Sequence, residues 1–151
     1  MLFRSPQDLS SSRWVNASDW WRDLGQRMAP LTWVRFTADT PLAGELPAEV
    51  FSGVVENLIR NASEKHLREA DLEVQVELRG VQAGFELLVC DSGSAIAEGI
   101  AASLFLGPVA SEGGYGIGLY NAARYAQAAG YRLEVVENRA GRVCFRLAQA
   151  G

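Results

Sequence analysis

Two asparagines lie one helical turn apart in a segment whose other periodic positions are apolar. Residues 51–66 repeat apolar side chains at helical spacing, and Asn57 and Asn61 fall at the border of the apolar stripe. A buried carboxamide without a partner costs roughly 1–3 kcal/mol, so these side chains need polar surroundings. Lys65 follows at the same step of four residues. The spacing therefore predicts a polar cavity between this helix and a sheet, which is the candidate site.

Two further polar segments interrupt the apolar pattern. Asp91 and Gly93 form a turn directly after an apolar run, and the glycine-rich residues 113–118 open onto a predicted helix. Unpaired N–H groups and the helix dipole favour an anion such as phosphate at that position. Each feature alone has an ordinary explanation as a solvated asparagine, a common turn or a chance glycine pattern. The glycine run matches no P-loop, and it does not follow a strand as a dinucleotide fingerprint would.

The elements around these segments predict one mixed α+β domain. We expect strands at residues 13–16, 31–37, 72–79, 85–90, 131–137 and 142–148, and helices at residues 19–28, 48–69, 97–104 and 116–129. This order favours a two-layer α/β sandwich, in which three helices cover one face of a mixed, mostly antiparallel sheet. Residues 38–47 are expected to be a loop, and residues 92–114 a long connection that contains the short helix at 97–104. Residues 1–12 are expected to be a linker and residues 13–151 the domain.

Length and composition agree with a single small domain. The chain has 151 residues, of which 48% are hydrophobic, and this length suffices for one core. A net charge of −4 provides no basic surface for nucleic acid or anionic lipid, so we expect contact with neither nucleic acid nor membrane. We expect a cytoplasmic location, or the cytoplasmic part of a membrane-bound sensor. Cys90 and Cys144 each lie in an apolar, strand-like run, and we expect reduced, buried thiols without a disulfide.

Taken in order, the three polar segments resemble the ATP-binding catalytic domain of sensor histidine kinases. The motifs are Glu56-Asn-Leu-Ile-Arg-Asn61-Ala, Asp91-Ser-Gly93-x-x-Ile96 and Gly114-Tyr-Gly116-Ile-Gly118-Leu119-Tyr. They are similar to the asparagine box and the two glycine boxes of that domain, which is related to the ATPases of gyrase, the heat-shock chaperone and MutL. The likeness spans roughly residues 14–147. It implies a Bergerat-type fold with ATP and Mg2+ as cofactors.

The resemblance also implies roles for individual residues. Asn61, supported by Asn57, would hold Mg2+, a cation that retains several waters among oxygen ligands. Asp91 would accept the adenine amine, and Gly93 would let the backbone approach the base. Glu56, Asn57 and Lys65 are the catalytic candidates, with Lys65 as the cation nearest the phosphates. The other expected nucleotide contacts are Ile96, Phe105, Gly114, Tyr115, Gly116, Ile117, Gly118 and Leu119.

The implied partners are a histidine-bearing dimerisation domain of the parent kinase and a downstream response regulator. The resemblance implies that a homodimer forms only through helices upstream of this domain. His66 is the only histidine of the chain, and we expect it to be an ordinary helix-end side chain rather than a phosphoryl acceptor.

Two departures from the family pattern leave other functions open. Ala95 replaces the second glycine of the first glycine box, and residues 92–114 contain no lysine or arginine for the γ-phosphate. A nucleotide-sensing or interaction module without turnover is therefore one alternative. Another is a serine kinase of the anti-sigma type, but that branch carries glutamate where this chain has Asn57. The asparagine favours the histidine-kinase branch.

Overall fold

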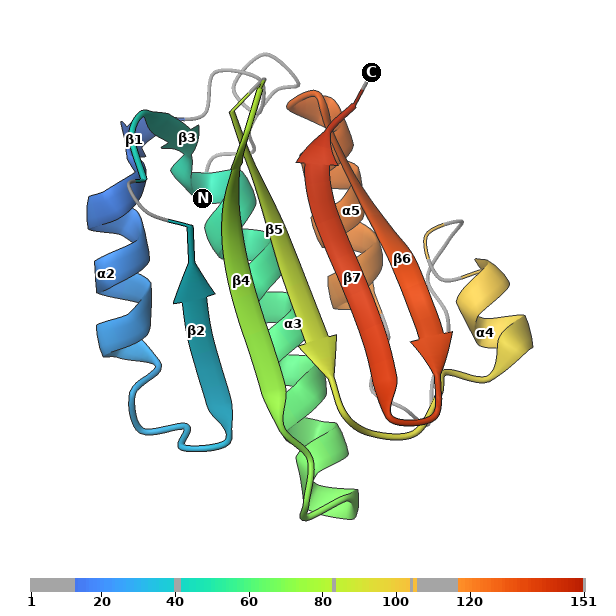
Figure 1. Ribbon diagram of the computed structural model, residues 1–151. Coiled ribbons are helices and arrows are strands. Elements are labelled where there is room, and N and C mark those ends of the chain that lie inside the picture. The colour runs from blue at the N-terminus through green and yellow to red at the C-terminus, as the bar shows by residue number, and fades with distance from the viewer. Residues whose placement is uncertain (1–12, 40–41, 83, 104, 106–116, 151) are drawn as a thin grey trace, which may run out of the picture.

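The computed structural model describes residues 13–39, 42–82, 84–103, 105 and 117–150, and it shows one main sheet with helices packed behind it (Figure 1). The five strands run in the order β2-β4-β5-β7-β6. Their bounds are Val34–Ala38 for β2, Val74–Val81 for β4, Gly84–Asp91 for β5, Arg142–Gln149 for β7 and Tyr131–Arg139 for β6. Only the β2–β4 pair among them is parallel. The predicted mixed, mostly antiparallel sheet is therefore confirmed.

Helices α2, α3 and α5 share the core on one face of the sheet. The helices are α2 (Ala17–Arg27), α3 (Ala48–Arg68), α4 (Glu98–Ser103) and α5 (Ile117–Ala128). Figure 1 shows α3 and α5 behind the strands and the short α4 beyond the β6 edge. Among the described residues, no helix has the length and apolar character needed to cross a membrane. The predicted two-layer arrangement of helices over a sheet is confirmed.

The apolar stripe of α3 explains its central place. Phe51, Val54, Val55 and Leu58 are at most 4% exposed, and they pack on the face of β5 that carries other buried residues. Along β5, buried and partly exposed positions alternate, as expected for a strand with helices on one side. Asn61 and Lys65 are the buried polar residues of α3, and they lie at the border of this apolar stripe. Their placement against the sheet therefore follows from the packing of the stripe.

One strand was missed within the expected loop at residues 38–47. β3 (Glu45–Pro47) pairs antiparallel with β1 (Trp14–Asn16) in a separate two-stranded sheet. Three residues are too few to show a periodic pattern, and Pro47 marks the start of α3 more clearly than the end of a strand. The pairing brings the segment before α2 against the start of α3.

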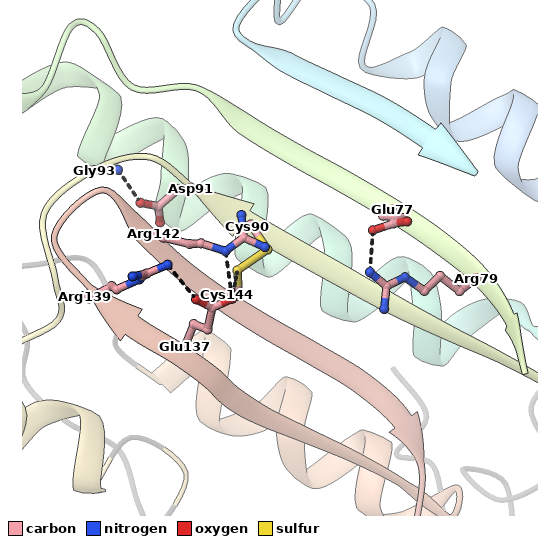
Figure 2. Close-up of a disulfide and its surroundings, with 9 residues drawn as sticks. All are labelled: Glu77, Arg79, Cys90, Asp91, Gly93, Glu137, Arg139, Arg142 and Cys144. Atoms are coloured by element: carbon pink, nitrogen blue, oxygen red, sulfur yellow. Dashed lines mark hydrogen bonds and ion pairs between the residues drawn. A yellow bond between two sulfur atoms is a disulfide. The ribbon is translucent and has the colours of Figure 1, made fainter. Parts of the chain in front are cut away.

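The prediction of two reduced thiols is wrong, because Cys90 and Cys144 form a disulfide (Figure 2). The two residues are direct partners in the antiparallel register of β5 and β7. They lie on the sheet face opposite the helices, since their strand neighbours Val89 and Val143 are buried in the core. The sequence placed each cysteine in a strand but did not indicate the register that brings them together.

We expect reduction of this disulfide to destabilise the fold. The bond closes a loop across a sequence separation of 54 residues. Such a cross-link contributes about 2–4 kcal/mol, which predicts a fall in Tm of roughly 5–15 °C with dithiothreitol. Circular dichroism melting measures the shift, and the double variant Cys90→Ala/Cys144→Ala should show none. Detection of two free thiols in the unreduced, folded protein would contradict the pairing.

Candidate functional site

The two helix asparagines lie at the edge of α3 that faces the sheet and α5. Asn61 is 9% exposed, and its Nδ2 atom has no hydrogen-bond partner among the described residues. Asn57 donates from Nδ2 to the Gly53 carbonyl at 2.8 Å, within its own helix. A buried, unpaired amide nitrogen is costly, so the Asn61 position is suited to a polar ligand or a water. The predicted burial of Asn61 at this edge is confirmed.

The start of α5 approaches Asn57 closely. A Cβ atom added to Gly118 would lie 2.6 Å from Asn57 Oδ1, so only glycine fits there without a shift. Beside this contact, a cavity of about 450 Å3 opens between α3 and α5. The hydrogen bond from the Tyr125 hydroxyl to Glu49 Oε2, 2.6 Å long, joins the same two helices along this cavity. The carboxamide oxygen and the helix start therefore border one open space.

Asp91 ends β5, and its carboxylate is paired with a lysine rather than open to solvent. Lys65 Nζ donates to Asp91 Oδ1 at 3.0 Å and to the Ser94 carbonyl at 2.6 Å. The two side chains are only 5% and 11% exposed, respectively. The Gly93 amide also donates to Asp91 Oδ1, at 2.9 Å (Figure 2). Sequence reasoning placed Lys65 near the phosphates, whereas the structure places its ammonium at the predicted adenine acceptor.

The turn after Asp91 is fixed from two sides by residues that sequence reasoning missed. Glu69, just beyond α3, accepts hydrogen bonds from the Ser94 amide at 2.8 Å and the Ser94 hydroxyl at 2.7 Å. On the other side, the Asn138 side chain binds both the amide and the carbonyl of Ile96. Glu69 follows Lys65 by four residues, so helical spacing could have indicated that Glu69 lies on the same side of the chain and contacts this turn. No local signal indicated the second.

Little free space remains between α3 and the sheet at this end of the site. The cavity there, bordered by Asn61, Lys65 and Asp91, has a volume of about 10 Å3. This is roughly enough for one water molecule. The site thus has an open end, between α3 and α5, and a closed end, at Asp91.

Other predicted residues lie at different distances from this centre. Glu56 faces α2, where its carboxylate lies 3.4 Å from Arg27. His66 stacks on Trp33 with ring centroids 4.5 Å apart, as a packed helix-end side chain would. Ile96 and Leu119 lie in the core, and Phe105 is partly buried against it. Ile117 is the first residue of α5. Gly114, Tyr115 and Gly116 lie outside the described residues.

A divalent cation at this site would depend on amide and ligand oxygens. In the described part of the chain, no group of three histidine, cysteine, aspartate or glutamate side chains is arranged to hold a metal. The unpaired amide of Asn61 presents Oδ1 at the same place after a half-turn of the group, and Asn57 Oδ1 points toward Gly118. Two neutral oxygens suit Mg2+, which keeps several waters and binds phosphate oxygens.

Comparison with known proteins identifies the family and the fold of the chain. The family model of the histidine kinase-, DNA gyrase B- and HSP90-like ATPases matches residues 48–150. No curated protein sequence matches the chain closely. Solved structures share its fold at low sequence identity, so their likeness establishes the architecture alone.

Three such structures are of histidine kinases. The nucleotide-free catalytic domain of ThkA superposes with a TM-score of 0.70 at 20% identity, covering 91% of this chain and 94% of that one. ThkA in complex with the response regulator TrrA gives 0.71 at 18% identity, covering 91% and 41%. Full-length ShkA in complex with AMPPNP gives 0.67 at 19% identity, covering 97% and 34%.

Two helix glycines provide a matched test of the Asn57 contact. Alanine at Gly25 of α2 meets no atom within 4 Å, so Gly25→Ala should raise the free energy of unfolding by about 0.5–1 kcal/mol through helix propensity. Gly118→Ala should give no such gain, because its Cβ displaces Asn57 and breaks the bond to Gly53. Urea denaturation measures both variants. Equal stabilisation by the two substitutions would show that Asn57 is not held against α5.

The turn after Asp91 should lose stability in acid through Glu69. Hydrogen bonds from Ser94, the side-chain bond foremost, hold the pKa of Glu69 below its usual value of 4.5. The ionised form is favoured in the folded state, so this contribution is present above pH 4.5 and lost as pH falls through the lowered pKa.

Substitution of Glu69 tests this assignment. Glu69→Gln should destabilise the domain by roughly 1 kcal/mol at pH 7, and the difference from the parent should shrink below pH 4.5. Melting curves from pH 7 to pH 3 measure it. Glu64→Gln, which removes a carboxylate from the exposed face of α3, is the control. A loss for Glu69→Gln that does not vary with pH would contradict the assignment.

Proposed function

The chain belongs to the family of histidine kinase-, DNA gyrase B- and HSP90-like ATPases, and from this premise we propose that it binds Mg2+ and ATP and donates the γ-phosphoryl group to a histidine on a separate dimerisation domain. The observation that carries the proposal is the approach of Asn57 Oδ1 to Gly118, beside the unpaired amide of Asn61. This arrangement combines metal-type oxygen ligands with the start of a helix. It suits a phosphate chain and its cation.

In this proposal the nucleotide extends from the end of β5 to the start of α5. Asp91 accepts the exocyclic amine of adenine, and Gly93 brings the backbone close to the base. The first N–H groups of α5 and Gly118 bind phosphate oxygens. Asn61 and Asn57 would hold Mg2+, and this cation would neutralise charge on the phosphates.

The protein contributes position and charge rather than a covalent intermediate. The imidazole of the acceptor histidine attacks the γ-phosphorus, and the bond from this phosphorus to the β,γ-bridging oxygen breaks, which leaves ADP. We assign no step to Glu56, because its carboxylate faces Arg27 of α2.

The proposal also defines partners and location. The chain would meet its acceptor histidine on the dimerisation domain of a parent kinase, and it would dimerise only through that domain's helices. ThkA is known in complex with a response regulator, and we propose such a regulator as the downstream acceptor. A domain that uses ATP in this way would act in the cytoplasm.

A nucleotide-sensing module without turnover is the second candidate. One observation favours it, namely that the adenine end of the site is closed by the Lys65–Asp91 pair and retains about 10 Å3 of space. A module of this kind would bind nucleotide weakly or slowly and transfer no phosphoryl group.

Asn61→Ala tests the proposed function. The variant should bind ATP at least about tenfold more weakly in the presence of Mg2+, with a smaller change in EDTA, because it removes a metal ligand. Isothermal titration calorimetry measures the affinity, and Gln127→Ala, an exposed amide on α5, is the control. Transfer of label from [γ-32P]ATP to a supplied histidine-bearing dimerisation domain should fall in parallel.

The outcomes of this experiment separate the candidate functions. Binding with label on histidine supports the kinase, and binding without transfer supports the sensing module. Label on serine of a cognate protein partner, added in place of the dimerisation domain, would support the anti-sigma type of kinase. Failure of the unsubstituted domain to bind ATP would overturn the proposed function.

A further inference from the structure

The only lysine of the chain is one of its most buried charged side chains. Lys65 lies on the core edge of α3, and its side chain is 5% exposed. Its ammonium makes two hydrogen bonds, to Asp91 Oδ1 and to the Ser94 carbonyl. A buried ammonium is stable only when it is paired and hydrogen-bonded, so this side chain is held where it lies.

Lys65 lies where the proposed function requires the purine. Its aliphatic stem packs on Gly93, because a Cβ added to that glycine would lie 2.8 Å from Lys65 Cε. Its ammonium contacts Asp91, the acceptor for the adenine amine, at 3.0 Å. The volume left between the helix and the sheet is about 10 Å3, far less than a purine needs.

We propose that Lys65 competes with the nucleotide base for Asp91. In the nucleotide-free domain Lys65 is bound to Asp91, and this contact sets the affinity and the selectivity of the domain for the base. This inference rests on the proposed function, since it concerns the same site. Lys65 supplies to Asp91 an N–H donor of the kind that the adenine amine would supply. Base binding is therefore an exchange of donors at one carboxylate.

The exchange leaves the base little net gain from Asp91. A hydrogen bond between an ammonium and a carboxylate is stronger than one from a neutral amine, so adenine replaces a strong donor with a weaker one. The open cavity of about 450 Å3 beside Asn57 and Gly118 remains accessible to phosphates. Phosphate contacts therefore provide most of the affinity of the domain for a nucleotide.

The same exchange weakens discrimination between adenine and guanine. Without a lysine, Asp91 would repel the guanine carbonyl and attract the adenine amine. With Lys65 beside it, the carbonyl meets an ammonium that can donate to it. The unsubstituted domain should therefore bind ATP and GTP with similar affinity.

Substitution of Lys65 tests the competitor. Lys65→Ala should tighten ATP binding about tenfold and raise the ratio of ATP to GTP affinity by a similar factor, because Asp91 is then free for the amine. Calorimetric titration with ATP and GTP measures both quantities. Arg68→Ala, which removes an equal charge from an exposed position on the same helix, should change neither.

The outcomes distinguish this inference from the proposed function. In one set of outcomes the unsubstituted domain binds ATP, while Lys65→Ala leaves the ATP affinity and the ratio of ATP to GTP affinity unchanged, or weakens the binding of both nucleotides equally. Either result overturns the inference about Lys65, and the proposed function stands. If neither protein binds any nucleotide, the proposed function fails. The inference about Lys65 then fails as well, because removal of its side chain did not allow a nucleotide to bind.

A measurement on the unsubstituted domain covers the case in which Lys65→Ala does not fold. Because the chain has one lysine, 15N-lysine labelling gives a single side-chain ammonium signal. The buried pair should protect this signal from exchange in the nucleotide-free domain, and saturating ATP should abolish the protection. A signal that ATP leaves unchanged would show that Lys65 stays in place, which would overturn the proposal.

Discussion

The structure depends on how α3 is packed, because one edge of this helix must be apolar enough for the core and polar enough for the site. Its apolar stripe fixes the helix against β5, and the residues at the border of the stripe are then buried whether or not they have partners. Asn57 satisfies its side-chain nitrogen within the helix, and Lys65 satisfies its ammonium at the end of β5. Asn61 does not, which marks the point where the helix is incomplete without a ligand or a water.

The closed end of the site is fixed by contacts from several elements. Hydrogen bonds from the helix side and from the β6 side hold the turn after Asp91, through Glu69 and Asn138 respectively. The disulfide between the neighbouring strands β5 and β7 adds a covalent link one residue away. In contrast, the open end lies between two helices that meet at Gly118 and are joined by the hydrogen bond from Tyr125 to Glu49. The two ends of the candidate site therefore differ in the kind of contact that holds them.

The sequence was informative where a property depends on local periodicity. The amphipathic pattern of α3 predicted the burial of Asn61, and the alternation in residues 72–79 predicted β4 with small errors at its ends. Pairings between distant segments were not readable. The Cys90–Cys144 disulfide and the binding of Ile96 by Asn138 both depend on strand register, which no local pattern of these residues specifies. The place of Lys65 on the border of the apolar stripe was predicted, but its contact with Asp91 was not.

A buried ion pair at a ligand site has a different meaning from one in a core. In a core, replacement of such a pair by apolar residues is often neutral, so the pair is weak evidence for stability. At the end of β5, however, the proposed function requires the carboxylate of Asp91 to accept a hydrogen bond from a ligand. Without a ligand it would be buried and unpaired, apart from the Gly93 amide. Lys65 supplies a donor from within the chain. In the proposed competition, the same donor would limit what Asp91 gains from a ligand.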